Sequence, residues 1–383
     1  MRIAIFSEVY WPMVSGVSLV LQRLAGALEQ RGHAVRVYAP DYTLPAGAGD
    51  LRTVHRVPSR SLFLYPDVRW GFPSWPAIRA DFADFRPDLV HVATEFSLGT
   101  AGVCLARDAR IPVVASAHTD YERYSSRYRL DWLMPVGWQY LRWFYGNAAR
   151  VLCPSKEYQR HLNLRGVRHT GIWSRGIDAE LFHPRHRSEA VRVALGIAPG
   201  QTMVLYVGRL AAEKGIDLLL EAWRRLEPRR GDARLVFVGT GPLEEAIRND
   251  HIPGVTLAGV RTGRDLAAIY ASADLFAFPS STETFGNVLL EAMASGLPSL
   301  AVAAGGVLDF AEHHTNAWLV EPGSPEAMAD GLETLLGDPA LRARLGESAR
   351  ATALGRDWHS IFDGVVQEYI GIIGEPARTM IAA

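Results

Sequence analysis

The stretch Ser-Ser-Thr-Glu-Thr-Phe-Gly-Asn-Val-Leu-Leu-Glu-Ala-Met-Ala-Ser-Gly-Leu-Pro, residues 280–298, decides the fold. It follows a short apolar run at residues 274–279, which is typical of a buried parallel strand. A helix is expected over residues 287–295, because Gly296 stands where a helix C-cap glycine belongs and Pro298 lies just beyond it. This order of strand, loop and helix predicts an α/β unit, in which ligands bind at the carboxyl ends of the strands.

Two glutamates in this stretch suit a ligand that carries hydroxyl groups. Glu283 is expected in the loop and Glu291 on the helix, and an ionised carboxylate only accepts hydrogen bonds. The backbone N–H groups of Phe285, Gly286 and Asn287 are expected at the helix start, where anions bind. Amides for phosphate and carboxylates for sugar hydroxyls together suit a nucleotide sugar. The alternative from spacing alone is a surface loop and an amphipathic helix with solvated glutamates.

Length and composition limit the class of protein. A chain of 383 residues is long enough for two domains. Its 40 basic and 41 acidic residues argue against a nucleic-acid binder, which is normally basic. Cys104 and Cys153 both stand in apolar runs and are expected to be buried thiols, so a disulfide framework is not expected and a cytoplasmic location fits. No apolar run reaches the roughly 20 residues that span a bilayer.

A second loop carries two cations. A strand is expected at residues 201–207, followed by a loop with Arg209 and Lys214 and then a helix. Arginine grips phosphate oxygens bidentately and lysine acts as a point charge, so both suit a departing diphosphate. Read alone, such residues would more often be solvated surface. The sequence has no Asp-x-Asp motif, so we expect neither a metal site nor a cofactor.

The first 40 residues predict a Rossmann-like start. A strand at residues 3–6 is followed by a loop, a helix from about residue 18, and a second strand at residues 34–38. The dinucleotide fingerprint G-x-G-x-x-G is missing, which argues against a nicotinamide dehydrogenase. Gly16 in the first loop would let the backbone approach a ligand closely, unless the loop is only a flexible turn. His118 follows a strand expected at residues 112–117, where a ligand contact and an ordinary strand-end residue are equal alternatives.

Residues 121–170 differ in composition from the rest of the chain. They contain nine basic and three acidic residues and many aromatic ones. A basic, aromatic surface can lie on an anionic membrane, whereas the alternative is aromatic core under a solvated face of arginines. The apolar residues 62–73 are expected to form an irregular loop. We expect residues 62–76 and 121–143 to decide the acceptor.

Four motifs together resemble the family-four retaining glycosyltransferases, over nearly the whole chain. The first two are Glu283 followed by Phe-Gly, and Glu291 followed by Ala-Met-Ala-Ser-Gly-Leu-Pro. The others are the diphosphate-loop pattern around Arg209 and Lys214, and the His-Thr pair that begins at His118. In the first loop, a serine replaces the first glycine of the Gly-Gly pair that relatives carry.

The resemblance implies the α/β fold class named GT-B, with two facing Rossmann-like, doubly wound domains. An acceptor-binding domain is expected at residues 1–185 and a nucleotide-sugar-binding domain at residues 186–355. Residues 356–383 are then a C-terminal helix that crosses back to the first domain.

The resemblance also implies site roles for a retaining transfer without a metal. His118, Glu283, Arg209 and Lys214 form the expected catalytic set. Glu291 is expected on the ribose hydroxyls and Glu283 on the donor-sugar hydroxyls. The expected donor-binding residues are Gly16, Arg209, Lys214, Val260, Arg261, Glu283, Thr284, Phe285, Gly286, Asn287 and Glu291.

Within the family, the chain most resembles bacterial GDP-mannose-dependent α-mannosyltransferases and sulfolipid synthases. The stretches that carry this resemblance are His-Thr-Asp-Tyr at 118–121, Trp-Ser-Arg-Gly-Ile-Asp at 173–178 and Glu-Leu-Phe-His-Pro at 180–184. It favours mannose from GDP-mannose and an acceptor on a lipid or lipid-linked glycan, at the inner face of the plasma membrane. The alternatives are a UDP-hexose-dependent lipid glycosyltransferase (glucose, galactose or sulfoquinovose), a GT-B UDP-sugar epimerase, and a non-catalytic sugar-nucleotide binder.

Overall fold

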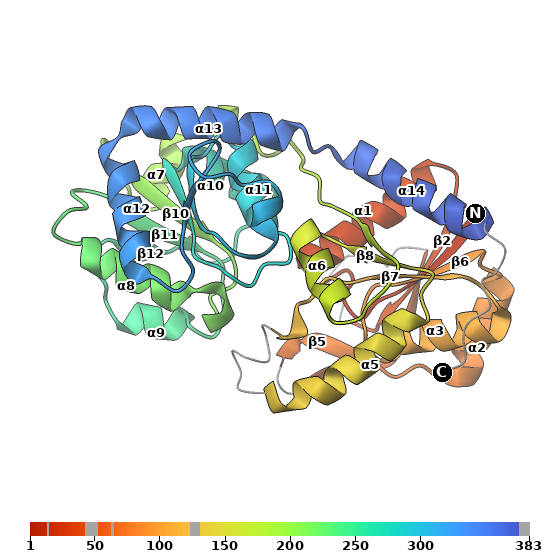
Figure 1. Cartoon of the computed structure of the whole chain (residues 1–383). Coiled ribbons are helices and arrows are strands. Elements are labelled where there is room, and N and C mark those ends of the chain that lie inside the picture. Colours follow the sequence, from red (N-terminus) through yellow and green to blue (C-terminus); the bar gives the residue numbers. More distant parts are fainter. Residues whose placement is uncertain (14, 43–52, 63–64, 123–130, 375–383) are drawn as a thin grey trace. The chain divides into compact units, whose positions relative to one another are not determined.

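The computed structural model describes residues 1–13, 15–42, 53–62, 65–122 and 131–374 (Figure 1). The chain forms two compact units, and each contains its own parallel sheet. The N-terminal unit comprises residues 1–119, 131–174 and the chain from 359 onward. The C-terminal unit is built mainly from residues 175–358.

The N-terminal unit has a seven-stranded parallel sheet in the order β3-β2-β1-β6-β7-β8-β9. Its strands are β1 (Arg2–Phe6), β2 (Ala34–Pro40), β3 (Val54–Val57), β6 (Leu89–Val92), β7 (Val113–Ser116), β8 (Arg150–Cys153) and β9 (Thr170–Ile172). Its helices are α1 (Gly16–Gln30), α2 (Trp75–Phe85), α3 (Ser97–Ala109), η1 (Asp131–Leu133), α5 (Met134–Gly146), α6 (Lys156–Leu164) and, at the chain's end, α14 (Trp358–Gly374).

The C-terminal unit has a six-stranded parallel sheet in the order β12-β11-β10-β13-β14-β15. Its strands are β10 (Met203–Val207), β11 (Arg234–Val238), β12 (Val255–Leu257), β13 (Leu275–Phe278), β14 (Ser299–Val302) and β15 (Trp318–Val320). Its helices are η2 (Pro184–His186), α7 (Glu189–Ala194), η3 (Ala212–Lys214), α8 (Ile216–Leu226), α9 (Glu244–Asn249), α10 (Gly263–Ser272), α11 (Asn287–Ala294), η4 (Gly305–Asp309), α12 (Pro325–Gly337) and α13 (Pro339–Leu354). The strand order reverses between β10 and β13, which creates a topological switch point.

The central strands of the C-terminal sheet are apolar on both faces. In β10, Met203, Leu205 and Val207 belong to one core cluster, whereas Val204 and Tyr206 belong to another. Helices α10 and α11 contribute to the first cluster, and α8 and α12 contribute to the second. Successive side chains of a strand point to opposite faces, so a sheet covered on both faces needs continuous apolar strands. This explains why the strands read as unbroken apolar runs.

Two sequence expectations about local structure are wrong. Part of the apolar stretch 62–73 belongs to an antiparallel hairpin of β4 (Ser59–Leu62) and β5 (Tyr65–Gly71). Backbone groups outside the main sheet still need hydrogen-bond partners, and the two strands supply them to each other. Cys104 is only half-buried, although Cys153 is buried, and both are free thiols.

Helix α14 is part of the N-terminal unit from residue 359 onward and lies beside α1 in Figure 1. Asp363 of α14 accepts two hydrogen bonds from Arg31, at 2.6 and 2.9 Å. Glu368 pairs with Arg150 of β8 at 3.0 Å. The C-terminal helix is therefore held to this sheet by charge pairs as well as by apolar packing. In the part of the chain that the structure describes, no helix is both long and apolar enough to cross a membrane.

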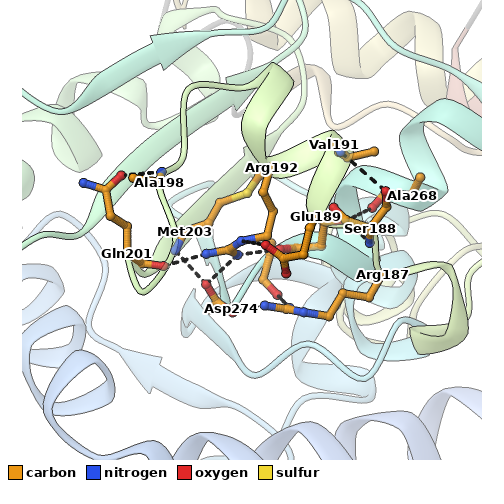
Figure 2. A network of polar contacts seen from close by, with 12 residues as sticks. Arg187, Ser188, Glu189, Val191, Arg192, Ala198, Gln201, Met203, Ala268 and Asp274 are labelled. Carbon is orange, nitrogen blue, oxygen red and sulfur yellow. Dashed lines mark hydrogen bonds and ion pairs between the residues drawn. The ribbon is translucent and has the colours of Figure 1, made fainter.

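Asp274, directly before β13, joins three segments of the C-terminal unit (Figure 2). Its carboxylate accepts hydrogen bonds from Arg187 at 2.9 Å, from Arg192 at 2.9 Å and from the Met203 N–H at 2.8 Å. Burial by itself raises the pKa of this carboxyl, but the Met203 N–H and the two arginines outweigh it, so the pKa lies below its usual value. The folded protein therefore favours the charged carboxylate.

We expect Asp274→Asn to destabilise the C-terminal unit by about 3 kcal/mol at pH 7, because it leaves the buried Arg192 with only the exposed Glu189 carboxylate, 3.7 Å away, as a counter-charge. A carboxyl whose pKa is lowered by folding stabilises the folded state fully above its unfolded pKa of about 3.9. This stabilisation is lost as the pH falls through the pKa of the carboxyl in the folded protein. The variant should therefore lose less stability than wild type between about pH 5 and pH 2. Urea unfolding of the full chain across this range measures both effects.

Asp330→Asn is the matched control, because Asp330 is exposed and lies 3.8 Å from Arg229 at the surface. Equal stability losses in the two variants would contradict the role of Asp274.

Candidate functional site

Loops at the carboxyl ends of β10, β11, β13 and β14 meet in the C-terminal unit. The Thr282 hydroxyl donates to the Glu213 carbonyl at 2.9 Å, which joins the β13 and β10 loops. The Gly306 N–H donates to the Glu283 carbonyl at 2.8 Å, which joins the β14 and β13 loops. The sequence-predicted residues of these loops are therefore brought together at the switch point of the sheet.

Charged side chains are paired across this loop cluster. The Lys214 ammonium donates to a Glu283 carboxylate oxygen at 2.7 Å, and both side chains are about one-fifth exposed. The Arg209 guanidinium lies 4.0 Å from the buried Glu213 carboxylate. An incoming dianion would compete with both carboxylates for the two cations, so the arrangement is suited to reversible anion binding.

Glycines allow the loops to approach one another. Gly215 has φ +71°, and a Cβ there would lie 2.4 Å from the Pro279 carbonyl oxygen. Gly286 has φ +99° and caps helix α11. A Cβ on Gly306 would lie only 2.1 Å from the Thr284 carbonyl oxygen. Only glycine fits these positions without moving backbone.

Gly306→Ala should therefore lower the unfolding free energy by about 3 kcal/mol, because the clash is with backbone that cannot rotate away. It should also weaken nucleotide binding, since the displaced segment carries Glu283 and Thr284. Calorimetry with and without GDP measures both. Gly337→Ala is the control, because no atom lies within 4 Å of a Cβ there. A variant Gly306→Ala that melts like Gly337→Ala would refute the packing argument.

Helix α11 presents its N-terminus to the loop cluster. Its N-cap is Gly286, and no side chain in the described structure caps it. The first N–H groups of a helix need an acceptor from elsewhere, and an anion suits them. Phe285 is buried beside this turn, and Asn287 is the first residue of the helix. The predicted backbone donors are thus at a helix start, as the sequence indicated.

Glu291 is oriented by a tyrosine that the sequence reasoning missed. The Tyr270 hydroxyl, on α10, donates to a Glu291 carboxylate oxygen at 3.0 Å and lies 3.2 Å from the Val288 carbonyl. Burial, and then the charge of Glu291, raises the pKa of Tyr270 well above its usual value, so it stays a donor. Tyr270 lies within an apolar helix pattern, which gives no signal of this role.

Tyr206 is a second supporting residue that was missed. Its hydroxyl donates to the Arg209 carbonyl at 3.0 Å and so holds the β10 loop. Burial raises its pKa strongly, and the charges of Glu283 and Glu213 raise it further. Val260 and Arg261, two further predicted residues, follow strand β12, which pairs with β11 at the edge of the same sheet. Val260 is 55% exposed, and Arg261 donates to the carbonyl of Val260 at 3.1 Å.

Gly16 and His118, the two remaining predicted residues, lie in the N-terminal unit. Gly16 is the first residue of α1, two residues earlier than expected, because the Ser15 hydroxyl caps the helix by accepting from the Ser18 N–H at 3.1 Å. His118 follows β7 and is 9% exposed. Its Nε2 lies 2.9 Å from the Ser116 hydroxyl.

A buried carboxylate after β1 also escaped the sequence reasoning. Glu8 accepts from the Ser97 hydroxyl at 3.0 Å, from the Leu98 N–H at 2.5 Å and from the Thr94 hydroxyl. Burial raises its pKa although these hydrogen bonds oppose the rise. Glu8 therefore caps helix α3. Its place in the loop after the first strand, like that of Glu283 in the loop after β13, was the available signal.

Helix α3 and the hairpin border a pocket of about 560 Å³ in the N-terminal unit. Its lining is mostly apolar and aromatic, with a few polar groups. The lining residues are Trp70, Gly71, Phe72, Pro73, Trp75, Glu95, Phe96, Ser97, Thr100, Ala101 and Tyr140. Such a pocket suits a ligand with both an apolar and a polar part.

Helix α5 carries two faces. Trp138, Leu141, Phe144 and Tyr145 are buried, whereas Val136 and Trp143 are 68% and 42% exposed. Some aromatics of this segment are therefore core and others are exposed, and its interpretation as a membrane-binding surface stays a prediction. Residues 123–130, which include part of the basic segment, lie outside the described residues.

Among the residues that the structure describes, no group of three or more His, Cys, Asp or Glu side chains is arranged to hold a metal ion.

Comparisons with known proteins cover both units. The model of Glycosyltransferase Family 4 matches residues 14–181, and the model of Glycosyl transferases group 1 matches residues 187–352. The GDP-mannose-dependent alpha-mannosyltransferase of Mycobacterium tuberculosis is 34% identical over 389 residues, with 100% of this chain and 99% of the relative covered. The alpha-monoglucosyldiacylglycerol synthase of Streptococcus pneumoniae is 32% identical over 313 residues, with 79% of this chain and 71% of the relative covered.

A solved structure with a similar fold is that of Anabaena HepE in complex with UDP. The TM-score is 0.77 at 22% identity, with 97% of this chain and 100% of that chain covered. The predicted family and fold class are both confirmed. The chain therefore belongs to glycosyltransferase family 4 and is a retaining glycosyltransferase with the GT-B fold.

Proposed function

We propose that the protein transfers mannose from GDP-mannose to a hydroxyl of a lipid or lipid-linked glycan, without a metal or cofactor. The observation that carries the proposal is the Lys214–Glu283 pair, 2.7 Å apart, beside Arg209 and the start of α11. The cations and the helix start suit the charged diphosphate of a nucleotide sugar, and the carboxylate suits its sugar hydroxyls.

In the proposed mechanism, Arg209 and Lys214 stabilise the negative charge that develops on the departing diphosphate. Lys214 moves from Glu283 to the phosphate, which leaves the Glu283 carboxylate to accept hydrogen bonds from the donor sugar. The amides of Phe285 and Gly286 assist at the same end of the donor. Glu291, held by Tyr270 at 3.0 Å, accepts from the ribose hydroxyls.

Retention follows if acceptor attack and diphosphate departure occur on one face of the sugar. A leaving phosphate oxygen then takes the acceptor proton, so no protein nucleophile is needed. In this proposal residues 186–355 bind the donor and residues 1–185 bind the acceptor, with 356–383 as the returning segment. Gly16 and His118 contribute from the acceptor domain, His118 at the reacting sugar. Val260 and Arg261 contact the nucleotide base.

GDP-mannose is favoured because a relative that aligns with this chain over 99% of its own length is a GDP-mannose-dependent enzyme. The competing donor is a UDP-hexose, in keeping with the relative that is a monoglucosyldiacylglycerol synthase. A thermal-shift panel of GDP, UDP, ADP and their hexose derivatives tests the donor. A ligand at 100 times its dissociation constant stabilises by about 2.7 kcal/mol. A shift with UDP compounds alone would overturn the mannose assignment.

Turnover separates the reaction classes. GDP-mannose and a lipid extract should give mannosylated lipid with the α-configuration preserved. Conversion of a UDP-sugar with no acceptor present would instead indicate an epimerase, and nucleotide binding without any turnover would indicate a silent binder.

The lipid acceptor is supported by exposed aromatic side chains around the pocket of 560 Å³. Trp70, Phe72 and Trp75 of its lining are 40%, 53% and 46% exposed. Trp132 on η1, which does not line the pocket, is 73% exposed. Tryptophan suits the boundary between water and lipid. We infer a peripheral position on the inner face of the plasma membrane. Flotation with anionic vesicles at low salt tests this peripheral position. A protein that does not float with the vesicles would contradict the membrane assignment.

A further inference from the structure

A chain of three hydrogen bonds runs inside the N-terminal unit from helix α14 to His118. The Tyr369 hydroxyl is hydrogen-bonded to Nδ1 of His91 on β6. Nε2 of His91 lies 2.8 Å from the Ser116 hydroxyl at the end of β7. The same hydroxyl lies 2.9 Å from Nε2 of His118. A residue close to the C-terminus is thus connected to a strand-end histidine through two neighbouring strands.

This series of hydrogen bonds is shielded from solvent, and the indole of Trp173 packs on one side of it. Tyr369 and His91 are fully buried, and Ser116 is 1% exposed. The Trp173 ring meets the His91 and His118 rings edge-on, with centroids 5.6 and 5.7 Å away. The inner links are therefore shielded from bulk solvent, and the two imidazoles are held in position.

Each link needs one hydrogen, so the chain has a direction. Burial lowers the pKa of His91 to about 3, so its ring is neutral near pH 7 and carries a single N–H. Tyrosine and serine hydroxyls also carry one hydrogen each. Ser116 could accept from both histidines only if its own hydrogen were buried without an acceptor, because the two histidines are the hydrogen-bond partners of its hydroxyl in the described structure. Two arrangements then remain: Tyr369 donates at one end and every group passes its hydrogen toward His118, or every hydrogen points the opposite way.

The surroundings of Tyr369 select between the two directions. Within the described structure its hydroxyl has His91 as its hydrogen-bond partner, and burial raises its pKa far above the usual value. If Tyr369 accepted from His91, its own hydrogen would be buried without an acceptor, which costs free energy. If Tyr369 donates, His91 donates from Nε2 to Ser116, and Ser116 donates to Nε2 of His118.

We propose that Tyr369 sets the tautomer of His118 and makes it a hydrogen-bond donor at Nδ1. Because Nε2 accepts from Ser116, the single N–H of the neutral His118 ring is at Nδ1. His118 then offers a hydrogen to a sugar oxygen and does not act as a base at that nitrogen. Tyr369, His91 and Ser116 are positioning residues that act through His118. The role at the sugar rests on the proposed function, whereas the tautomer does not.

The direct test is ¹⁵N NMR of the histidine rings in the full chain near pH 8, without any substrate. The His118 signals are assigned by their loss in His118→Gln. In the wild type we expect the Nδ1–H tautomer to predominate. In Tyr369→Phe the bias should disappear and the Nε2–H form should rise, and Ser116→Ala should have the same effect. A predominant Nε2–H tautomer in the wild type, or a ratio unchanged in both variants, would overturn the proposal.

Tyr38→Phe is the matched control, because Tyr38 is also a buried tyrosine of this unit and donates to Asp81 at 2.8 Å. It should leave the His118 signals unchanged. Should Tyr369→Phe not fold, Ser116→Ala alone still decides, because it breaks the last link and removes no ring.

Kinetics separate this inference from the proposed function. Loss of one oriented hydrogen bond should lower kcat roughly three- to tenfold in Tyr369→Phe and Ser116→Ala. The dissociation constant for GDP should not change, because the proposed diphosphate residues belong to the C-terminal unit. A tautomer shift without any change in kcat would keep the tautomer assignment and remove His118 from the reacting sugar.

Discussion

Replacing Arg209 and Lys214 together with alanine should lower kcat/KM about 10³-fold or more, since a single donor aimed at developing charge can contribute 10²- to 10³-fold. The diphosphate gains negative charge as the glycosidic bond breaks, and these two side chains are the proposed source of compensating charge. The double variant should also lose the thermal shift that GDP produces. Steady-state kinetics and calorimetry give the two values.

The single variants should differ in an informative way. Lys214→Ala removes a cation and also leaves the Glu283 carboxylate, 2.7 Å away in the wild type, as an unpaired negative charge beside the phosphate. Lys214→Ala combined with Glu283→Gln should therefore bind GDP better than Lys214→Ala alone, because the second substitution removes that unpaired charge. The effects of substitutions at residues in contact are not expected to be additive. Arg225→Ala is the control, since Arg225 is half-exposed and pairs with Glu221 at 2.9 Å on a helix surface. A double variant Arg209→Ala/Lys214→Ala as active as this control would refute the diphosphate assignment.

The two glutamates should separate catalysis from binding. Glu283→Gln should lower kcat by about 10²-fold, because it weakens hydrogen bonds that form with the reacting sugar in the transition state. It should leave the affinity for GDP unchanged or higher, since a negative charge near the phosphate disappears. Glu291→Gln should instead raise the dissociation constant for GDP roughly tenfold, the range of one hydrogen bond to a charged group, with a smaller effect on kcat.

Initial rates with varied donor, together with titration of GDP, distinguish these patterns. Glu333→Gln is the surface control, because Glu333 pairs with Arg229 on exposed side chains. Identical kinetic profiles for Glu283→Gln and Glu291→Gln would remove the separate roles assigned to them.

Some supporting residues could not be found from the sequence, and the reason is physical. Tyr270, Tyr206 and Tyr369 all stand in apolar patterns and are buried as those patterns require. Their function depends on which polar atom meets the hydroxyl, and those partners lie 21, 3 and 278 positions away along the chain. Hydrophobic periodicity predicts which face of a helix or strand is buried. It does not predict which group will form a hydrogen bond with a buried hydroxyl.

What the sequence determined by itself was the alternation of apolar strands and helices, the loops that follow the strands, and the residues in those loops. Parallel strands bring their carboxyl ends to one edge, so the loops that carry Lys214 and Glu283 were expected at the same edge of a sheet, whereas the pairing of β10 with β13 came from the structure. Only the tertiary structure decided that the two form an ion pair, that Gly306 touches the Thr284 carbonyl and that β4 and β5 form a hairpin. It also decided the path from Tyr369 to His118. Apart from the hairpin, whose two strands are neighbours in sequence, these features depend on contacts within a few ångströms between distant segments, and such contacts exist only after the sheets have assembled.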